Sequence, residues 1–296
     1  MISVKEYQKP IIWISLVLTI ISTTIFCLTV PKPNKYKLVL ENEVNLITPD
    51  ILVNNDLDFD GNSEKITFYK NHGGALSILA ESNERILFQN KYDGQFMRGR
   101  FFFINDCNKN KRKEIFFFRV ISDSLFLDVV ETCPENCWVA RRFITKLYKP
   151  NGTFDQSIGA YNFNDLNNDG FDEFIFCIAC GYSLINRNIY IYNPITDSLL
   201  ISPKSASSIF RRLRLFDIDS DNHKEIFGQF CAIGNSNEDY PWTDQHCWFM
   251  VYTDSLTFKF RPYITGNYSG SIETTPYCTS NKKYIAAFQL DQGKTD

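Results

Sequence analysis

The sequence predicts an all-β fold preceded by one apolar helix. Three observations support this prediction: an acid-rich loop pattern occurs four times, each copy leads into a hydrophobic run, and one uncharged segment near the N-terminus is 20 residues long. Short strand-like runs separated by turn residues also favour antiparallel sheets over βαβ units. A single all-β domain of this size is ordinary, so the 296 residues require only one large domain.

The N-terminal segment predicts a membrane anchor. Residues 1–10 form a polar tail, and residues 11–30 carry no charge. About 20 apolar residues in a helix cross the hydrocarbon core of a bilayer. A cleavable signal peptide is the alternative, but its end would carry small residues, whereas this segment ends in Phe26-Cys27-Leu28. We therefore expect a single-pass protein of the cell membrane, with most of the chain outside the cytoplasm.

A linker and a first strand follow at residues 31–43, where Pro31 ends the helix. The first acid-rich loop begins soon afterwards, and its candidate metal ligands are Asp56, Asp58, Asp60, Asn62 and Glu64. Alternating oxygen ligands in one tight turn suit a hard cation such as Ca²⁺. Gly61 fits that turn because glycine adopts positive φ without steric cost.

The same pattern recurs at intervals of 50, 59 and 52 residues. Two further copies offer Asp165, Asn167, Asp169 and Glu173, and Asp217, Asp219, Asp221 and Glu225. The second copy in the chain is a weak metal loop with Asp106, Asn108, Asn110 and Glu114, where neighbouring lysines oppose a cation. Each loop could instead be a metal-free turn in which Asp and Asn side chains cap the backbone.

The intervals match the length of a four-stranded propeller blade. They predict that residues 44–296 form a β-propeller of about five four-stranded blades, or part of a larger propeller. A fifth copy at residues 279–283 lacks the acids. Because an open arc would leave unpaired strand edges, we expect either five closed blades or the front part of a longer chain.

The net charge argues against one class of partner, and the cysteine content bears on the compartment. The net charge is −3 and no basic stripe occurs, so nucleic acid is not an expected partner.

Nine cysteines are many for a domain kept in a reducing compartment. In an oxidising one, the pairs Cys133–Cys137 and Cys231–Cys247 are the disulfide candidates, although sequence cannot fix connectivity. Cys177 and Cys180 lie in an apolar run and are interpreted as buried small hydrophobes.

The four loops resemble the FG-GAP/VCBS repeat family, whose blades build integrin α-chain propellers and many bacterial exported proteins. Residues 181–188, 202–206 and 240–245 look like segments of the propeller-type sensor regions of membrane-bound bacterial histidine kinases. The resemblance implies the extracytoplasmic sensory half only. The chain has neither a phospho-acceptor histidine box nor the glycine-rich ATP-binding boxes of the kinase.

These patterns predict a non-enzymatic module that senses or binds an extracellular ligand or protein partner. An exported propeller enzyme of lyase or glycosidase type is the alternative, and an integrin-like adhesion protein is a third. The enzyme needs acids or a histidine that converge in one pocket. His246 beside Cys247 invites a nucleophile, but a strand residue next to a core cysteine is the simpler interpretation. The group Tyr240, Trp242 and Trp248 could line a groove or pack a core.

Overall fold

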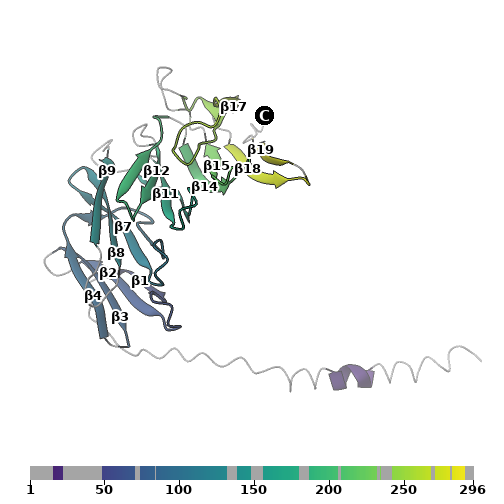
Figure 1. Cartoon of the computed structure of the whole chain (residues 1–296). Coiled ribbons are helices and arrows are strands. Elements are labelled where there is room, and N and C mark those ends of the chain that lie inside the picture. Colours follow the sequence, from purple (N-terminus) through teal and green to yellow (C-terminus); the bar gives the residue numbers. More distant parts are fainter. Residues whose placement is uncertain are drawn as a thin grey trace, which may run out of the picture. The chain divides into compact units, whose positions relative to one another are not determined.

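The computed structural model describes residues 16–22, 49–70, 74–83, 85–131, 139–147, 156–179, 187–205, 208–231, 234, 242–267, 271–280 and 282–290. The chain divides into two compact units, Met1–Asn45 and Leu46–Asp296. The described part of the first unit is one short helix at residues 16–22 (Figure 1). No helix among the described residues is long and apolar enough to span a membrane. The remainder of the anchor predicted at residues 11–30 lies outside the described residues.

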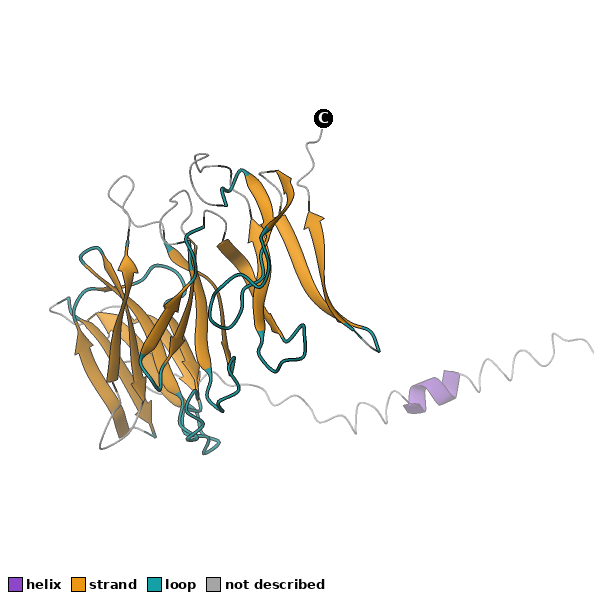
Figure 2. Ribbon diagram, turned by 45° about the horizontal axis from the view of Figure 1, so that its top comes forward, coloured by secondary structure: helices purple, strands orange, loops and turns teal. Residues whose placement is uncertain are grey.

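The second unit is built from antiparallel strands, as predicted (Figure 2). Two of its sheets have four strands that pair in chain order. The first sheet contains β1 (Pro49–Asn55), β2 (Glu64–Lys70), β3 (Leu76–Ser82) and β4 (Arg85–Tyr92). The third sheet contains β10 (Ser157–Asn164), β11 (Glu173–Ala179), β12 (Ile189–Asn193) and β13 (Ser198–Ile201).

The second sheet follows the same order, but its first strand is interrupted. The two pieces, β5 (Gln95–Phe96) and β6 (Phe102–Asn105), both pair with β7 (Glu114–Ile121). The sheet then continues through β8 (Ser124–Glu131) and β9 (Val139–Lys146).

The fourth sheet departs from this order. Its strands are β14 (Ser208–Phe216), β15 (Glu225–Cys231), β18 (Ser271–Cys278) and β19 (Lys283–Leu290). A separate pair, β16 (His246–Phe249) and β17 (Tyr263–Asn267), lies between β15 and β18 in the chain. The all-β prediction is confirmed, whereas the pairing of the described strands does not define a closed ring of blades.

Successive sheets pack face to face, and β7, the second strand of its sheet, contacts the sheets on both sides. In β7, Phe117 contacts Tyr92 of the first sheet, with ring centroids 5.0 Å apart, while Phe116 lies 5.3 Å from Phe174 of the third sheet. Because adjacent strand residues point to opposite faces, β7 is buried on both sides. This burial explains its nearly continuous apolar sequence.

The third sheet is also covered on both faces. Phe174 and Phe176 of β11 belong to the core shared with the first two sheets. Ile175 belongs to a second core, which contains Ile226 of the fourth sheet. The hydrophobic core therefore lies between consecutive sheets, and it leaves the connecting loops at their ends accessible to solvent.

Candidate metal centre

All four acidic loops connect the first strand of a sheet to the second. In each, the closing glutamate begins the second strand and pairs with the residue that precedes the loop: Asn55 with Glu64, Asn105 with Glu114, Asn164 with Glu173, and Phe216 with Glu225. The sequence pattern thus marks the same position in each sheet.

Two side chain–backbone hydrogen bonds recur in every loop. Oε2 of the closing glutamate accepts from the N–H at loop position 2, at 2.7 Å from Leu57, 2.8 Å from Cys107, 2.9 Å from Leu166 and 2.8 Å from Ile218. Oδ2 of the first aspartate accepts from the N–H at position 6, at 3.1 Å from Gly61 and Lys111, 2.9 Å from Gly170 and 3.4 Å from Asn222. Aspartate side chains that bond to nearby backbone hold such turns without any metal.

The loop backbone also repeats its left-handed residues. Position 6 has positive φ in Gly61, Lys111, Gly170 and Asn222, as the glycine in the first loop predicted. Position 4 has positive φ as well, in Phe59, Lys109, Asn168 and Ser220. No glycine occupies position 4 in any of the four loops, and of its residues only Asn168 is of a type that favours this region.

The first loop brings three of its five predicted ligands together. Asp56, Asp58 and Glu64 each offer a carboxylate oxygen, and the three oxygens lie within 4.8 Å of one another. Glu64 is 1% exposed, and its Oε1 has no hydrogen-bond partner among the described residues. Oδ1 of Asp56 is also buried without such a partner. Buried anionic oxygens of this kind are costly unless a cation or a donor reaches them.

The other two predicted ligands of this loop bond to each other. The carboxylate of Asp60 accepts from the backbone N–H of Asn62 at 2.7 Å and from its side-chain amide at 3.2 Å. Oxygen atoms of Asp56, Asp58 and Glu64 in one turn fit a hard divalent cation. Ca²⁺ bound there would supply the positive charge that the buried carboxylate oxygens lack.

The fourth loop already contains a cation from the protein itself. Asp217, Asp219 and Glu225 again cluster within 4.8 Å. Nζ of Lys259 lies 2.6 Å from Asp219 and 2.7 Å from Oε1 of Glu225, with Asp221 at 3.9 Å. Hydrogen bonds to Asp219 and then to Glu225 raise the pKa of Lys259 above its ordinary value. This ammonium group compensates the charges of Asp219 and Glu225, whereas the corresponding acids of the first loop have no protein cation among the described residues.

In the third loop, amide groups satisfy the buried glutamate. Oε1 of Glu173 accepts from the side-chain amide of Asn193 at 2.9 Å and from that of Asn167 at 3.4 Å. Asp169 caps the backbone of Phe171 at 2.9 Å. Burial raises the pKa of Glu173. These predicted ligands form a hydrogen-bonded turn that does not require a metal.

The second loop is the poorest metal site, as its sequence indicated. The amides of Asn108 and Asn110 donate to Glu131 at 3.1 and 3.0 Å. Glu114 is fully buried, and burial raises its pKa to about 7. Oδ1 of Asp106 and Oε1 of Glu114 have no hydrogen-bond partner among the described residues. Protonation of Glu114 removes its negative charge and so lowers the free-energy cost of burying this carboxyl group.

The remaining candidates contribute no assembled catalytic group among the described residues. Cys133, Cys137 and the side chain of Cys231 lie outside those residues, so both disulfides stay predictions. The rings of Trp242 and Phe258 meet edge to face with centroids 4.7 Å apart, and both are partly buried against the second core. Burial raises the pKa of Cys177 to about 12, which suits a buried small hydrophobe.

Two histidines, His223 of the fourth acidic loop and His246, lie among the described residues, whereas His72 lies outside them. His246 is half-buried in β16 beside the buried Cys247, and His223 bonds to Asp254 at 2.6 Å on the surface.

Comparison of the chain with protein-family models, with curated proteins and with solved structures gives no match.

Proposed function

We propose that the second unit is a propeller-type binding module, stabilised by calcium, that senses a ligand outside the cytoplasm and is not an enzyme. The observation that carries this proposal is the recurrence of the same two hydrogen bonds in four successive strand-connecting loops. Face-to-face packing of consecutive sheets supports it as well, because propeller blades pack in this way.

Calcium has a defined role in this proposal. In the first loop, the ion would bind Asp56, Asp58 and Glu64 and join the start of β2 to the loop that precedes it. A buried carboxylate that gains a cation no longer opposes folding. The ion thereby stiffens the corner of one sheet and leaves the opposite ends of the strands free to bind a ligand.

Thermal melts of the full-length protein in calcium and in chelator test the metal site. We expect calcium to stabilise the wild type by roughly 2–3 kcal/mol at a hundredfold excess over its dissociation constant. Asp58→Asn should abolish this gain. Asp123→Asn, which changes an exposed aspartate beside the turn between β7 and β8, should keep it. Equal melting temperatures of the wild type in calcium and chelator would refute the calcium site.

A further inference from the structure

The last strand of the fourth sheet, β19, has one edge without a partner strand among the described residues. Its eight residues all pair with β18, and no other described strand pairs with it. β18 in turn pairs with β15 only at Ser271 and Ile272, and the β18–β19 hairpin extends away from β14 and β15 (Figure 1). The outer edge of β19 therefore presents backbone N–H and C=O groups to which another strand could bond.

β19 lacks the features that protect the outer edges of the other sheets. β4 carries two cationic residues, β9 carries three, and β13 is only four residues long. Charged side chains and short length both discourage pairing at an edge. The residues from Tyr284 to Leu290 include neither a charge nor a proline. Lys283, the one cation of β19, is already bound to Asp217 at 3.2 Å.

Two exposed aromatic side chains lie on one face of this strand. Tyr284 and Phe288 are 45% and 56% exposed. Ala286 lies between them on the same face, because strand residues two apart share a face. Tyr277 of β18 extends the aromatic face, with its ring centroid 6.4 Å from that of Tyr284. Exposed apolar groups that gather in this way mark surfaces that contact another protein.

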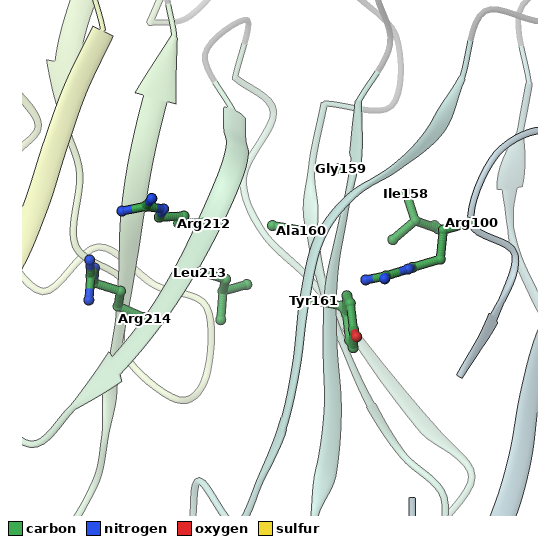
Figure 3. A pocket seen from close by; sticks show the side chains of 8 residues that line it. All are labelled: Arg100, Ile158, Gly159, Ala160, Tyr161, Arg212, Leu213 and Arg214. Atoms are coloured by element: carbon green, nitrogen blue, oxygen red, sulfur yellow. The ribbon is translucent and has the colours of Figure 1, made fainter. Parts of the chain in front are cut away.

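The charged part of the same face is satisfied within the chain. Figure 3 shows Arg212 and Arg214 leaving β14 on the side opposite Leu213. Both arginines pair with Glu273 of β18, at 2.7 and 3.3 Å. Glu273 lies opposite Phe288 in the hairpin, and the two guanidinium groups compensate its charge. A strand that pairs with β19 would therefore meet aromatic side chains rather than an uncompensated carboxylate.

We propose that β19 pairs antiparallel with β19 of a second copy of this chain, about a two-fold axis at Ala286. In this register, Tyr284 of each copy lies opposite Phe288 of the partner subunit, and the small Ala286 pair lies between the two aromatic pairs. Aromatic pairs across strands stabilise antiparallel sheets. No like charges meet, because Lys283 lies opposite an uncharged residue, Gln289 of the partner subunit.

Pro276 of β18 fits this register. It lies opposite Ile285 and has no N–H to donate to β19. A ladder that alternates from this pair bonds Tyr284 and Phe288 to β18 and directs the backbone groups of Ile285 and Ala287 to the open edge. Tyr284 and Phe288 would then meet their counterparts in non-hydrogen-bonded pairs, where side chains of adjacent strands are closest.

Sedimentation velocity of the full-length protein in a nonionic detergent, over a series of protein concentrations, tests the dimer. We expect an equilibrium between monomer and dimer. Phe288→Lys should raise the dissociation constant roughly tenfold or more, because this one substitution removes both aromatic pairs. Ile86→Lys, at an exposed position on β4 of the first sheet, should leave the dissociation constant unchanged.

A pair of opposite charges tests the register. Tyr284→Glu alone should weaken the dimer, as Phe288→Lys does. The double variant Tyr284→Glu/Phe288→Lys places a carboxylate opposite an ammonium group in both pairs, and it should dimerise roughly tenfold more tightly than either single variant. Within one chain the two positions are about 13 Å apart along the strand, so this recovery reports contact between copies. A misfolded variant cannot produce it.

Monomer at every concentration, equal weakening by Ile86→Lys, or no recovery in the double variant would each overturn the proposed dimer. The inference goes beyond the proposed calcium-stabilised module and does not depend on it. Asp58→Asn, which removes one proposed calcium ligand in the first sheet, should leave dimerisation unchanged. The dimer and the calcium site can therefore fail separately.

Discussion

The closing glutamates show how one residue in one position can meet four environments. Each is at most 3% exposed and accepts the same backbone hydrogen bond. Glu64 has one oxygen without a partner, Glu114 holds a proton more strongly, Glu173 receives two amides, and Glu225 receives an ammonium group. The position of each glutamate could be predicted from the sequence. Its partner could not, because Lys259 and Asn193 lie far along the chain in segments without the repeating pattern.

Glu114 should make stability depend on pH in the range in which it titrates. Its pKa rises from the ordinary 4.5 to about 7 in the folded protein, so folding favours the protonated form. The stabilisation is complete below the unfolded value and is lost as the pH rises through the folded value. Glu114→Gln removes this loss, and the variant should be more stable than the wild type at pH 8, by about 3 kcal/mol at most.

Urea unfolding of both proteins from pH 4 to pH 8 measures this difference. The two stabilities should converge near the acid end and diverge as the pH approaches 8. Glu81→Gln is the matched control, because Glu81 is partly exposed and forms only a 3.9 Å pair with Lys65. A constant offset between Glu114→Gln and the wild type across this range would contradict the prediction.

At the scale of the element, the first and fourth loops share a sequence motif but differ in the charged group that reaches it. Its acids match those of the first loop closely, and the sequence predicted calcium for both. The fold places Lys259 within reach of both Asp219 and Glu225, so its ammonium group compensates these two acids, and calcium binding at this loop stays a prediction. The interrupted first strand of the second sheet and the inserted β16–β17 pair were not predicted either, because turn residues such as Gly94, Gly99 and Asp254 mark chain reversals but not which strands pair.

Removal of the ammonium group should turn the fourth loop into a cation site. In the background Asp58→Asn, which disables the first loop, Lys259→Gln removes the ammonium partner of Asp219 and Glu225 and should destabilise the protein in chelator, although Lys283 still pairs with Asp217. Calcium should then restore stability with a dissociation constant of roughly 10⁻⁴–10⁻³ M, as in weak extracellular sites. Thermal melts across a calcium series measure both effects.

Lys65→Gln in the same background is the control, since Lys65 forms a longer surface pair outside the loops. It should show no calcium response. If Lys259→Gln lowered stability equally at every calcium concentration, the lysine would be a structural contact rather than a substitute for a metal.

At the scale of the whole molecule, the sequence predicted the strand-rich second unit and the position of its loops, because hydrophobic runs and turn residues repeat along it. It did not predict how the last strands pair, since that pairing depends on contacts between distant segments. The proposed membrane anchor at residues 11–30 rests on the apolar sequence of that segment.

Deletion of residues 11–30 tests the anchor. We expect the full-length protein in the membrane fraction of cells and the deleted form in the soluble fraction, because the deletion removes the 20-residue apolar segment. Deletion of residues 1–10 should leave the protein in the membrane fraction. Protease added to intact cells should digest residues 44–296 of the anchored protein. Full-length protein in the soluble fraction, or protection from protease, would contradict the proposed topology.

The pairing of β15 with β18 also constrains the order of folding during synthesis. The first three sheets close within short stretches of chain, so each can form as soon as its last strand leaves the ribosome. β15 must wait for Ser271–Cys278, about 40 residues further on, and meets it only at Phe230 and Cys231. Until then, the Phe230–Cys231 end of that strand lacks its neighbour, while Ile226 at the other end can already pair with Tyr252. Synthesis of β18 and β19 is therefore the step on which completion of the fourth sheet, and its protection from aggregation, depends.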